Sequence, residues 1–213
     1  MIASVDFRLA PDHPYPAQVQ DTRCGIRWRR PTPRSLTPRR TLSVGRELRA
    51  AAIPLCWRRC GLTALSSPDV DGHDGTVAYA IAGSPLLDSY ARYQYAQGIE
   101  NNNLMASAEN YFLNEDAMQE GSPQGILETG EDAALPPLLI IQGTADMNVP
   151  MSMPHAFVES YRATGGSVEL DEYPDMPHNF ILRVGKETDH ALGVVKAFVA
   201  QQLTASTVAT PAD

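Results

Sequence analysis

The stretch LPPLLIIQGTADMNVP, residues 135–150, decides the fold of this chain. Its apolar run from Leu138 to Gln142 lies between two prolines and Gly143. A short apolar run bounded in this way predicts a strand buried on both faces, as in parallel sheets. The loop that follows carries Asp146, and sites in open α/β sheets form at the carboxyl ends of the strands. Asp146 is therefore a candidate site residue, with a helix cap or a turn as the equally supported alternative.

The composition is that of an ordinary globular chain. Its 213 residues, 43% of them hydrophobic and 20% charged, are enough for one medium domain. No apolar run reaches transmembrane length, and the first residues, MIASVDFRLAP, mix acid and base, so we expect neither a membrane span nor a signal peptide. The cysteines form no metal or redox spacing. We therefore expect free thiols, no cofactor and a cytoplasmic location.

The charge is distributed unevenly. Residues 23–60 hold eleven arginines and one acid, a net charge of +10, whereas the rest of the chain carries six basic and 24 acidic residues, a net charge of −18. One interpretation is a basic arm that binds nucleic acid or another polyanion. No recognition motif accompanies these arginines, so we expect no nucleic-acid partner and keep polyanion binding as the least favoured alternative.

Apolar periodicity predicts the other elements. Strands are expected at 4–7, 76–83 and 167–173, the last nearer the sheet edge, and helices at 17–28, 151–164 and 187–203. The helix at 151–164 is expected to bury Met153, Phe157 and Tyr161, and the last helix Leu192, Val195, Phe198 or Val199, and Leu203. Residues 84–123 predict one or two helices with irregular structure. Four tyrosines there are pocket candidates, although packing is the commoner role: Tyr90, Tyr93, Tyr95 and Tyr111.

The segment VDFRLAPDHPYPAQVQDTRCGIRW, residues 5–28, resembles the α/β-hydrolase superfamily, on its hormone-sensitive-lipase-like and feruloyl/acetyl-xylan-esterase-like side. In that family the segment is a core strand, a proline-rich loop and the helix before the nucleophile strand. The resemblance covers residues 4–28 and about 76–200. It implies an α/β-hydrolase fold, a partial doubly wound and mostly parallel sheet with flanking helices. We expect one incomplete domain at 1–204 and a tail at 205–213.

The resemblance also implies an acid and a base. The strand and loop at 136–150 resemble those that carry the family's catalytic acid, which would be Asp146, although Gln142 stands where the family usually has His. PDMPHNF places His178 where the family has its base. Acid before base is the family's chain order, and each residue follows a predicted strand, so we expect the two to hydrogen-bond. The other histidines lack such a context: His13, His73, His155 and His190.

The nucleophile elbow G-x-S-x-G, in contrast, is absent from the sequence. GSPQG at 121–125 and GGSVE at 165–169 do not fit the motif, and the aligned position holds Glu47, Leu48 and Arg49. The family's His-Gly-Gly oxyanion segment lies upstream of the VDFRLAP strand, with which this chain begins, so we expect it to be missing as well.

Residues 29–61 are hypothesised to be a frameshifted translation. With GC-rich codons, a shifted reading of residues 46–59 can give Gly-Ala-Ser-x-Gly-Gly-His, and such out-of-frame sequence is a simple source of Arg, Pro, Cys and Trp. We expect the frame to be restored near Leu62 and the segment to be partly disordered; a clean gene sequence encoding these arginines would refute the hypothesis. By resemblance, the chain is a carboxylic-ester hydrolase for small short-acyl, acetyl or feruloyl esters, inactive as written. A non-catalytic remnant is the alternative.

Overall fold

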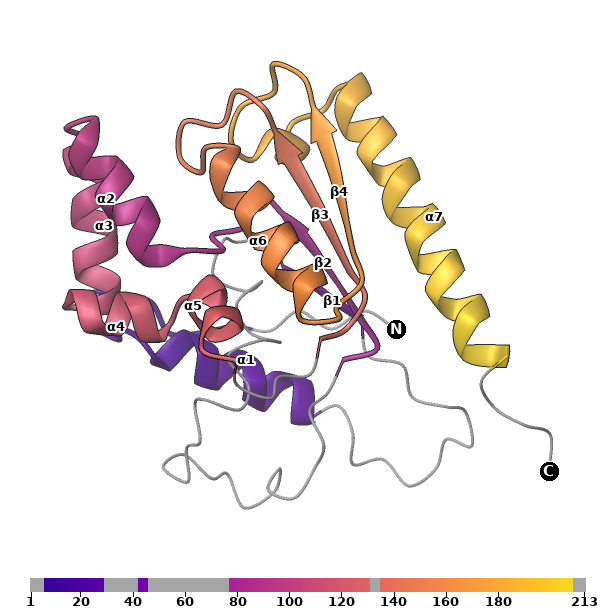
Figure 1. Cartoon of the computed structure of the whole chain (residues 1–213), viewed down its shortest axis with the longest axis horizontal. Helices are drawn as coiled ribbons and strands as arrows, with labels where there is room; N and C mark the ends of the chain where they lie inside the picture. The colour runs from indigo at the N-terminus through magenta and orange to yellow at the C-terminus, as the bar shows by residue number, and fades with distance from the viewer. Residues whose placement is uncertain (1–5, 29–41, 46–76, 131–134, 209–213) are drawn as a thin grey trace.

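A parallel sheet forms the centre of this protein. A computed structural model of the chain describes residues 6–28, 42–45, 77–130 and 135–208. These residues contain a four-stranded sheet in the order β1-β2-β3-β4, in which every neighbouring pair is parallel (Figure 1). The strands are β1 Leu42–Gly45, β2 Tyr79–Gly83, β3 Leu138–Gly143 and β4 Val168–Tyr173. The predicted α/β class with a parallel sheet is confirmed, and β4 lies at its edge as expected.

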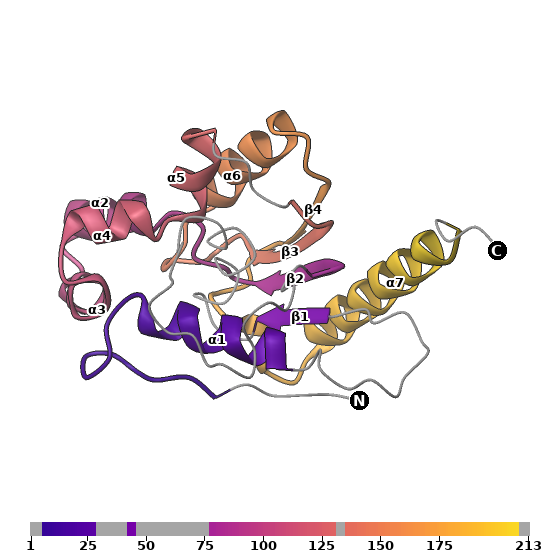
Figure 2. The ribbon, with the colours of Figure 1, turned by 90° about the horizontal axis from the view of Figure 1, so that it is seen from below.

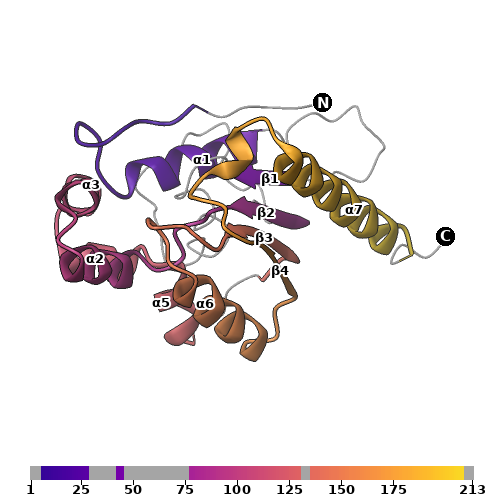
Figure 3. The same ribbon diagram turned by 90° about the horizontal axis from the view of Figure 1, so that it is seen from above.

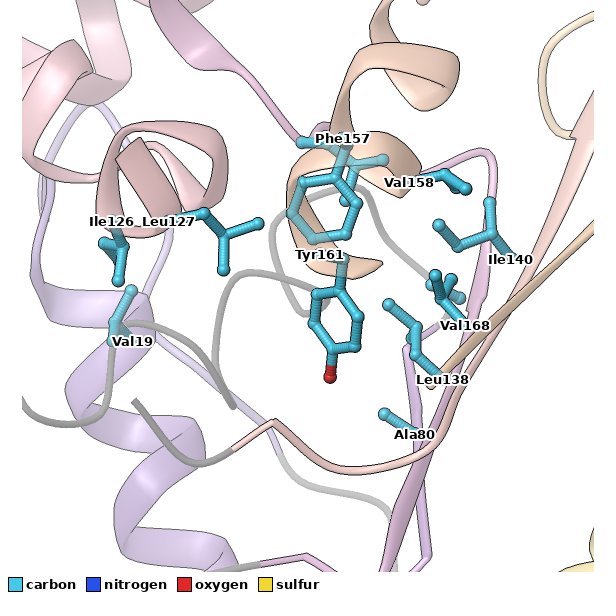
Figure 4. Packing of buried hydrophobic residues seen from close by; sticks show 12 residues of the cluster. Val19, Ala80, Ile126, Leu127, Leu138, Ile140, Phe157, Val158, Tyr161 and Val168 are labelled. Carbon is cyan, nitrogen blue, oxygen red and sulfur yellow. The ribbon is translucent and has the colours of Figure 1, made fainter. Parts of the chain in front are cut away.

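Helices cover both faces of the sheet (Figures 2 and 3). Helix α6, Ser152–Ala163, lies on one side and helix α7, Lys186–Val208, on the other. Helix α1, Ala17–Trp28, has the bounds that the sequence predicts, and its Val19 lies beside Ile126 in the core under α6 (Figure 4). The predicted stripe of α6 is buried: Met153, Phe157 and Tyr161.

Alternate residues of β3 enter two separate cores. Leu138 and Ile140 join the first core, together with Phe157 of α6 (Figure 4). Leu139 and Ile141 point to the opposite face, because successive side chains of a strand alternate, and join the core under α7. All residues of β3 are buried, which confirms the prediction of a strand covered on both faces.

The segment after β2 contains more helices than expected. Four follow one another there: α2 Ser89–Gly98, α3 Asn102–Phe112, α4 Glu115–Glu120 and α5 Pro123–Glu128. Each is preceded by an N-cap residue whose side chain accepts a main-chain N–H of the first turn, and these caps are Asp88, Asn101, Asn114 and Ser122. Ser122, the serine of the GSPQG stretch, is thus a buried N-cap.

The buried stripe of α7 differs from the predicted one. Ala191 and Phe198 are buried, and their spacing of seven positions places them on the same face of the helix. Val195 packs beside them. Leu192 is 51% exposed and Leu203 is 42% exposed, so both predictions are wrong. Leu192 lies one residue of helical rotation away from the buried Ala191. The carboxyl end of α7 extends past the strands (Figures 2 and 3). The helix also continues through the expected domain boundary at 204 to Val208.

The strand expected at 4–7 is not found in its described part. Asp6 and Phe7 belong to no regular element, and residues 4 and 5 lie outside the described residues. The next residue, Arg8, is held by α1 instead: its main-chain N–H and its guanidinium donate to the carboxylate of Asp21 at 2.8 Å. This contact anchors the residue before the proline-rich loop to α1 rather than to the sheet.

Strand β1 lies inside the segment expected to be frameshifted and partly disordered. It pairs with β2, with Leu42 opposite Tyr79 and Gly45 opposite Ala82. It follows α1 and precedes β2 in the sequence, which is the place that the family resemblance gives to the nucleophile strand. A strand is thus present at residues 42–45, and the expectation that the segment 29–61 is partly disordered stays a prediction. The other residues of 29–61 lie outside the described part, and the polyanion-binding alternative, which rests on them, stays a prediction.

In the described ranges, no helix has the length and apolar character needed to cross a bilayer.

Candidate active site

The two candidate residues meet at the carboxyl edge of the sheet. Asp146 follows β3 and His178 follows β4, and these strands are neighbours. His178 Nδ1 lies 2.7 Å from Asp146 Oδ2, so the predicted hydrogen bond is present. The Asp146 side chain is fully buried, whereas 14% of the His178 side chain is exposed. The pair therefore consists of a buried carboxylate and an imidazole that reaches the surface.

The Asp146 carboxylate is surrounded by hydrogen-bond donors. Its Oδ1 accepts the N–H groups of Asn148 at 2.7 Å and Val149 at 2.9 Å. Its Oδ2 accepts from His178 and, at 2.8 Å, from Nε2 of Gln142. Burial by itself raises the pKa of Asp146, but the hydrogen bonds from His178, Val149 and Asn148 outweigh it and hold the pKa below its usual value. Asp146 thus shapes its turn through one oxygen and holds the histidine through the other.

The ionised carboxylate also selects the form of the histidine ring. A carboxylate oxygen only accepts hydrogen bonds, so the proton of a neutral His178 ring lies on Nδ1, the atom that faces Asp146. Nε2 is then the unprotonated nitrogen, at the opposite side of the ring. The arrangement can hold a general base in one tautomer and stabilise the cation that forms when Nε2 takes a proton.

The lowered pKa of Asp146 predicts a pH dependence of folding stability. Because the pKa is lower in the folded chain than in the unfolded one, the ionised carboxylate stabilises the fold above about pH 4 and loses this effect as pH falls through the folded-state value. We expect the difference in unfolding free energy between the native chain and Asp146→Asn to shrink as pH falls below about 4. Urea unfolding of both proteins at each pH measures it, and parallel pH profiles would contradict it.

The loops that carry Asp146 and His178 run in direct contact. Ala145 donates its N–H to the carbonyl of Met176 at 3.0 Å, and Asp175 donates its N–H to Thr144 Oγ1 at 2.9 Å. A Cβ atom at Gly143 would overlap the carbonyl oxygen of Met176. Only glycine therefore permits this approach, and it brings His178 to the acid.

The end of β2 supports the histidine loop from the other side. Ser84 is fully buried, has a φ of 46°, and its Oγ accepts the N–H of Asn179 at 3.2 Å. A Cβ atom at Gly83 would overlap the side chain of Ile181. Sequence reasoning missed both residues, and the Gly-Ser-Pro that ends the strand run was the available signal.

The other residues singled out from the sequence lie elsewhere. The His155 ring contacts Glu172 at 2.8 Å on the surface, and the His190 ring contacts the Tyr173 hydroxyl at 3.1 Å. Of the candidate tyrosines, Tyr111 is buried against Tyr15 and Phe112. Tyr93 donates to Glu109, Tyr90 lines a cavity of about 600 Å³, and Tyr95 lines one of about 300 Å³.

The position aligned with the family's nucleophile follows closely after β1. The strand ends at Gly45, and Glu47, Leu48 and Arg49 lie outside the described residues. In the described ranges, no three or more His, Cys, Asp or Glu side chains are grouped as in a metal site.

Comparison with known proteins identifies the family. Esterase LipC of Mycobacterium tuberculosis is 27% identical over 218 residues, which cover 93% of this chain and 49% of that protein, so the chain spans about half the length of the curated relative that it matches. EstE5 soaked with p-nitrophenyl butyrate is 25% identical, with a TM-score of 0.63 over 92% of this chain and 64% of that one. The thermophilic esterase Est2 of Thermogutta terrifontis, with propionate bound, is 20% identical, with a TM-score of 0.64 over 95% and 70% of the chains. The model of the alpha/beta hydrolase fold family matches residues 1–182, and the chain belongs to that family.

Proposed function

We propose that this chain carries the acid and the base of a serine carboxylesterase. The observation that supports it most is the 2.7 Å contact between His178 Nδ1 and the buried Asp146 carboxylate. In a serine esterase, the free ring nitrogen takes the proton of the nucleophile and later gives it to the leaving alcohol. His178 has the tautomer for this step, and Asp146 would stabilise the imidazolium that forms.

The proposed substrates are small esters, either of short acyl groups or of acetyl or feruloyl groups. The relatives support this class: the Thermogutta esterase was solved with propionate, and EstE5 was soaked with p-nitrophenyl butyrate. Both compounds contain a short acyl chain, which is why a p-nitrophenyl ester is the first substrate to test.

We further propose that the chain as written does not turn over esters. The sequence has no G-x-S-x-G, and Glu47, Leu48 and Arg49 provide no hydroxyl at the aligned position. Loss of the serine of a triad lowers kcat by about a millionfold. The strand β1 lies just before this position and pairs with β2. Its presence supports the proposal that the sheet is kept while the sequence of the nucleophile elbow is changed.

The test is hydrolysis of p-nitrophenyl acetate by the purified chain, with His178→Ala as the control. We expect both proteins to release nitrophenol at the same low rate. A frame-restored chain, with residues 29–61 replaced by the shifted reading and with any coding sequence upstream of residue 1, is expected to turn over the ester and to lose this activity with His178→Ala. Turnover by the chain as written that is abolished by His178→Ala would refute the proposal that the nucleophile is missing. A folded but inactive frame-restored chain would refute the esterase assignment.

A further inference from the structure

A fully buried glutamine reaches the acid from within the sheet. Gln142 lies near the end of β3, and its Nε2 donates to Asp146 Oδ2 at 2.8 Å and to the Val149 carbonyl at 3.2 Å. Both partners only accept hydrogen bonds, which fixes the orientation of the amide. The oxygen that receives the bond from Gln142 is the same one that His178 Nδ1 contacts at 2.7 Å.

The other end of this amide is unsatisfied. Gln142 Oε1 is buried and has no hydrogen-bond partner in the described part of the chain. A buried acceptor without a partner disfavours folding. The preceding residues of β3 are all apolar, Leu138 to Ile141, and an apolar side chain at 142 would avoid the unsatisfied oxygen. The feature that the amide adds is the donor that faces Asp146 and Val149.

We propose that Gln142 acts on the His178 base through Asp146, because its amide shares the oxygen Oδ2 that the histidine contacts. The inference rests on the proposed function, in which His178 acts as the base. A second N–H donor withdraws negative charge from Oδ2, so the carboxylate stabilises the imidazolium less.

The position of the carboxylate does not depend on this contact. Asp146 Oδ1 is held by the N–H groups of Asn148 and Val149, which belong to the main chain and remain when Gln142 is changed. Removing the amide donor therefore alters the charge on Oδ2 and leaves the acid in place. Removal of the donor is therefore expected to stabilise the imidazolium of His178 more, and not less.

The experiment follows the titration of the His178 ring by NMR in the chain as it exists, so it needs no ester turnover. In Gln142→Met, which has nearly the same shape and no donor, we expect the pH at which the ring gains its second proton to rise by about one unit. Asp146 is the ionisable group in contact with His178 among the described residues, and Asp175 on the same loop is exposed. An unchanged midpoint in a folded variant would overturn the proposal.

The matched control is Gln124→Met. Gln124 is also a buried glutamine, its Nε2 donates to Glu128 and Ser160, and its Oε1 also lacks a partner within the described residues. We expect this variant to leave the His178 titration unchanged. An equal shift in both variants would mean a general loss of packing and would overturn the proposal.

A second variant covers the case in which Gln142→Met fails to fold. Gln142→Leu also removes the donor, and it is expected to raise the His178 midpoint in the same direction as Gln142→Met. If both variants at 142 unfold while Gln124→Met folds, the role of Gln142 is structural and the proposal fails. Ester turnover is measured separately, so a failed esterase assay leaves the NMR result intact.

Discussion

Replacing Asp146 with asparagine in the frame-restored chain is expected to lower kcat/KM for p-nitrophenyl acetate by about 10⁴-fold, with the fold retained. Asparagine has nearly the same shape as aspartate, and its Oδ1 can still accept the N–H groups of Asn148 and Val149. Its amide nitrogen then faces His178 Nδ1, where the carboxylate oxygen was. The substitution therefore exchanges an acceptor for a donor at the contact with the histidine.

This exchange reverses the tautomer of the ring. With an N–H donor in front of it, Nδ1 of His178 has to accept, so the ring proton moves to Nε2 and the free base is lost. The main-chain N–H groups of Asn148 and Val149 still hold the side chain at 146, so the fold is retained while His178 loses its free base.

Nitrogen NMR of the His178 ring checks the mechanism in the chain as written, and ester kinetics check it in the frame-restored chain. The control is Asp175→Asn, at an exposed residue of the same loop whose φ of 59° asparagine adopts readily. We expect this control to leave the tautomer and the rate unchanged. An Asp146→Asn protein that keeps the proton on Nδ1, or that loses less than tenfold in rate, would contradict the role given to Asp146.

The pair itself could be predicted because each member depends on a local pattern. The apolar run before Gly143 and the alternating run before Tyr173 both indicate strands, and parallel neighbours end at the same edge. The family resemblance then selected Asp146 and His178 among the polar loop residues. Local pattern and chain order were sufficient for these two positions.

The supporting contacts could not be predicted in the same way. Ser84 meets Asn179 across 95 positions of the sequence, and this contact requires that β2, β3 and β4 lie in this order in the sheet. Gln142 stood out only as a departure from the family's usual residue, and its shared oxygen follows from the geometry of the loop. The burial of Leu192 was misjudged because periodicity finds an apolar face without showing how the helix is rotated against the sheet.

Gly143→Ala is expected to lower the free energy of unfolding by about 3 kcal/mol and to separate His178 from Asp146. The added methyl group would overlap the Met176 carbonyl oxygen and lie 3.0 Å from that of Pro177. These are main-chain atoms and no rotamer change can remove them, so the histidine loop has to move away from β3. Its movement stretches the hydrogen bond from Ala145 to Met176, and it carries His178 away from the acid.

Gly98→Ala is the matched control, since a Cβ atom at this last residue of α2 would meet no other atom within 4 Å. There we expect the free energy of unfolding to stay the same or to rise by up to about 1 kcal/mol, because alanine restricts the unfolded chain.

Urea unfolding measures both variants, and NMR of the His178 ring reports whether the hydrogen bond to Asp146 survives. If Gly143→Ala matches Gly98→Ala in stability and keeps that bond, the close approach of the two loops does not position the histidine. If it loses stability but keeps the bond, the overlap is relieved elsewhere and other contacts, such as that of Ser84 with Asn179, hold the histidine loop. Loss of both, with Gly98→Ala unaffected, is the result that the main-chain contact at Gly143 requires.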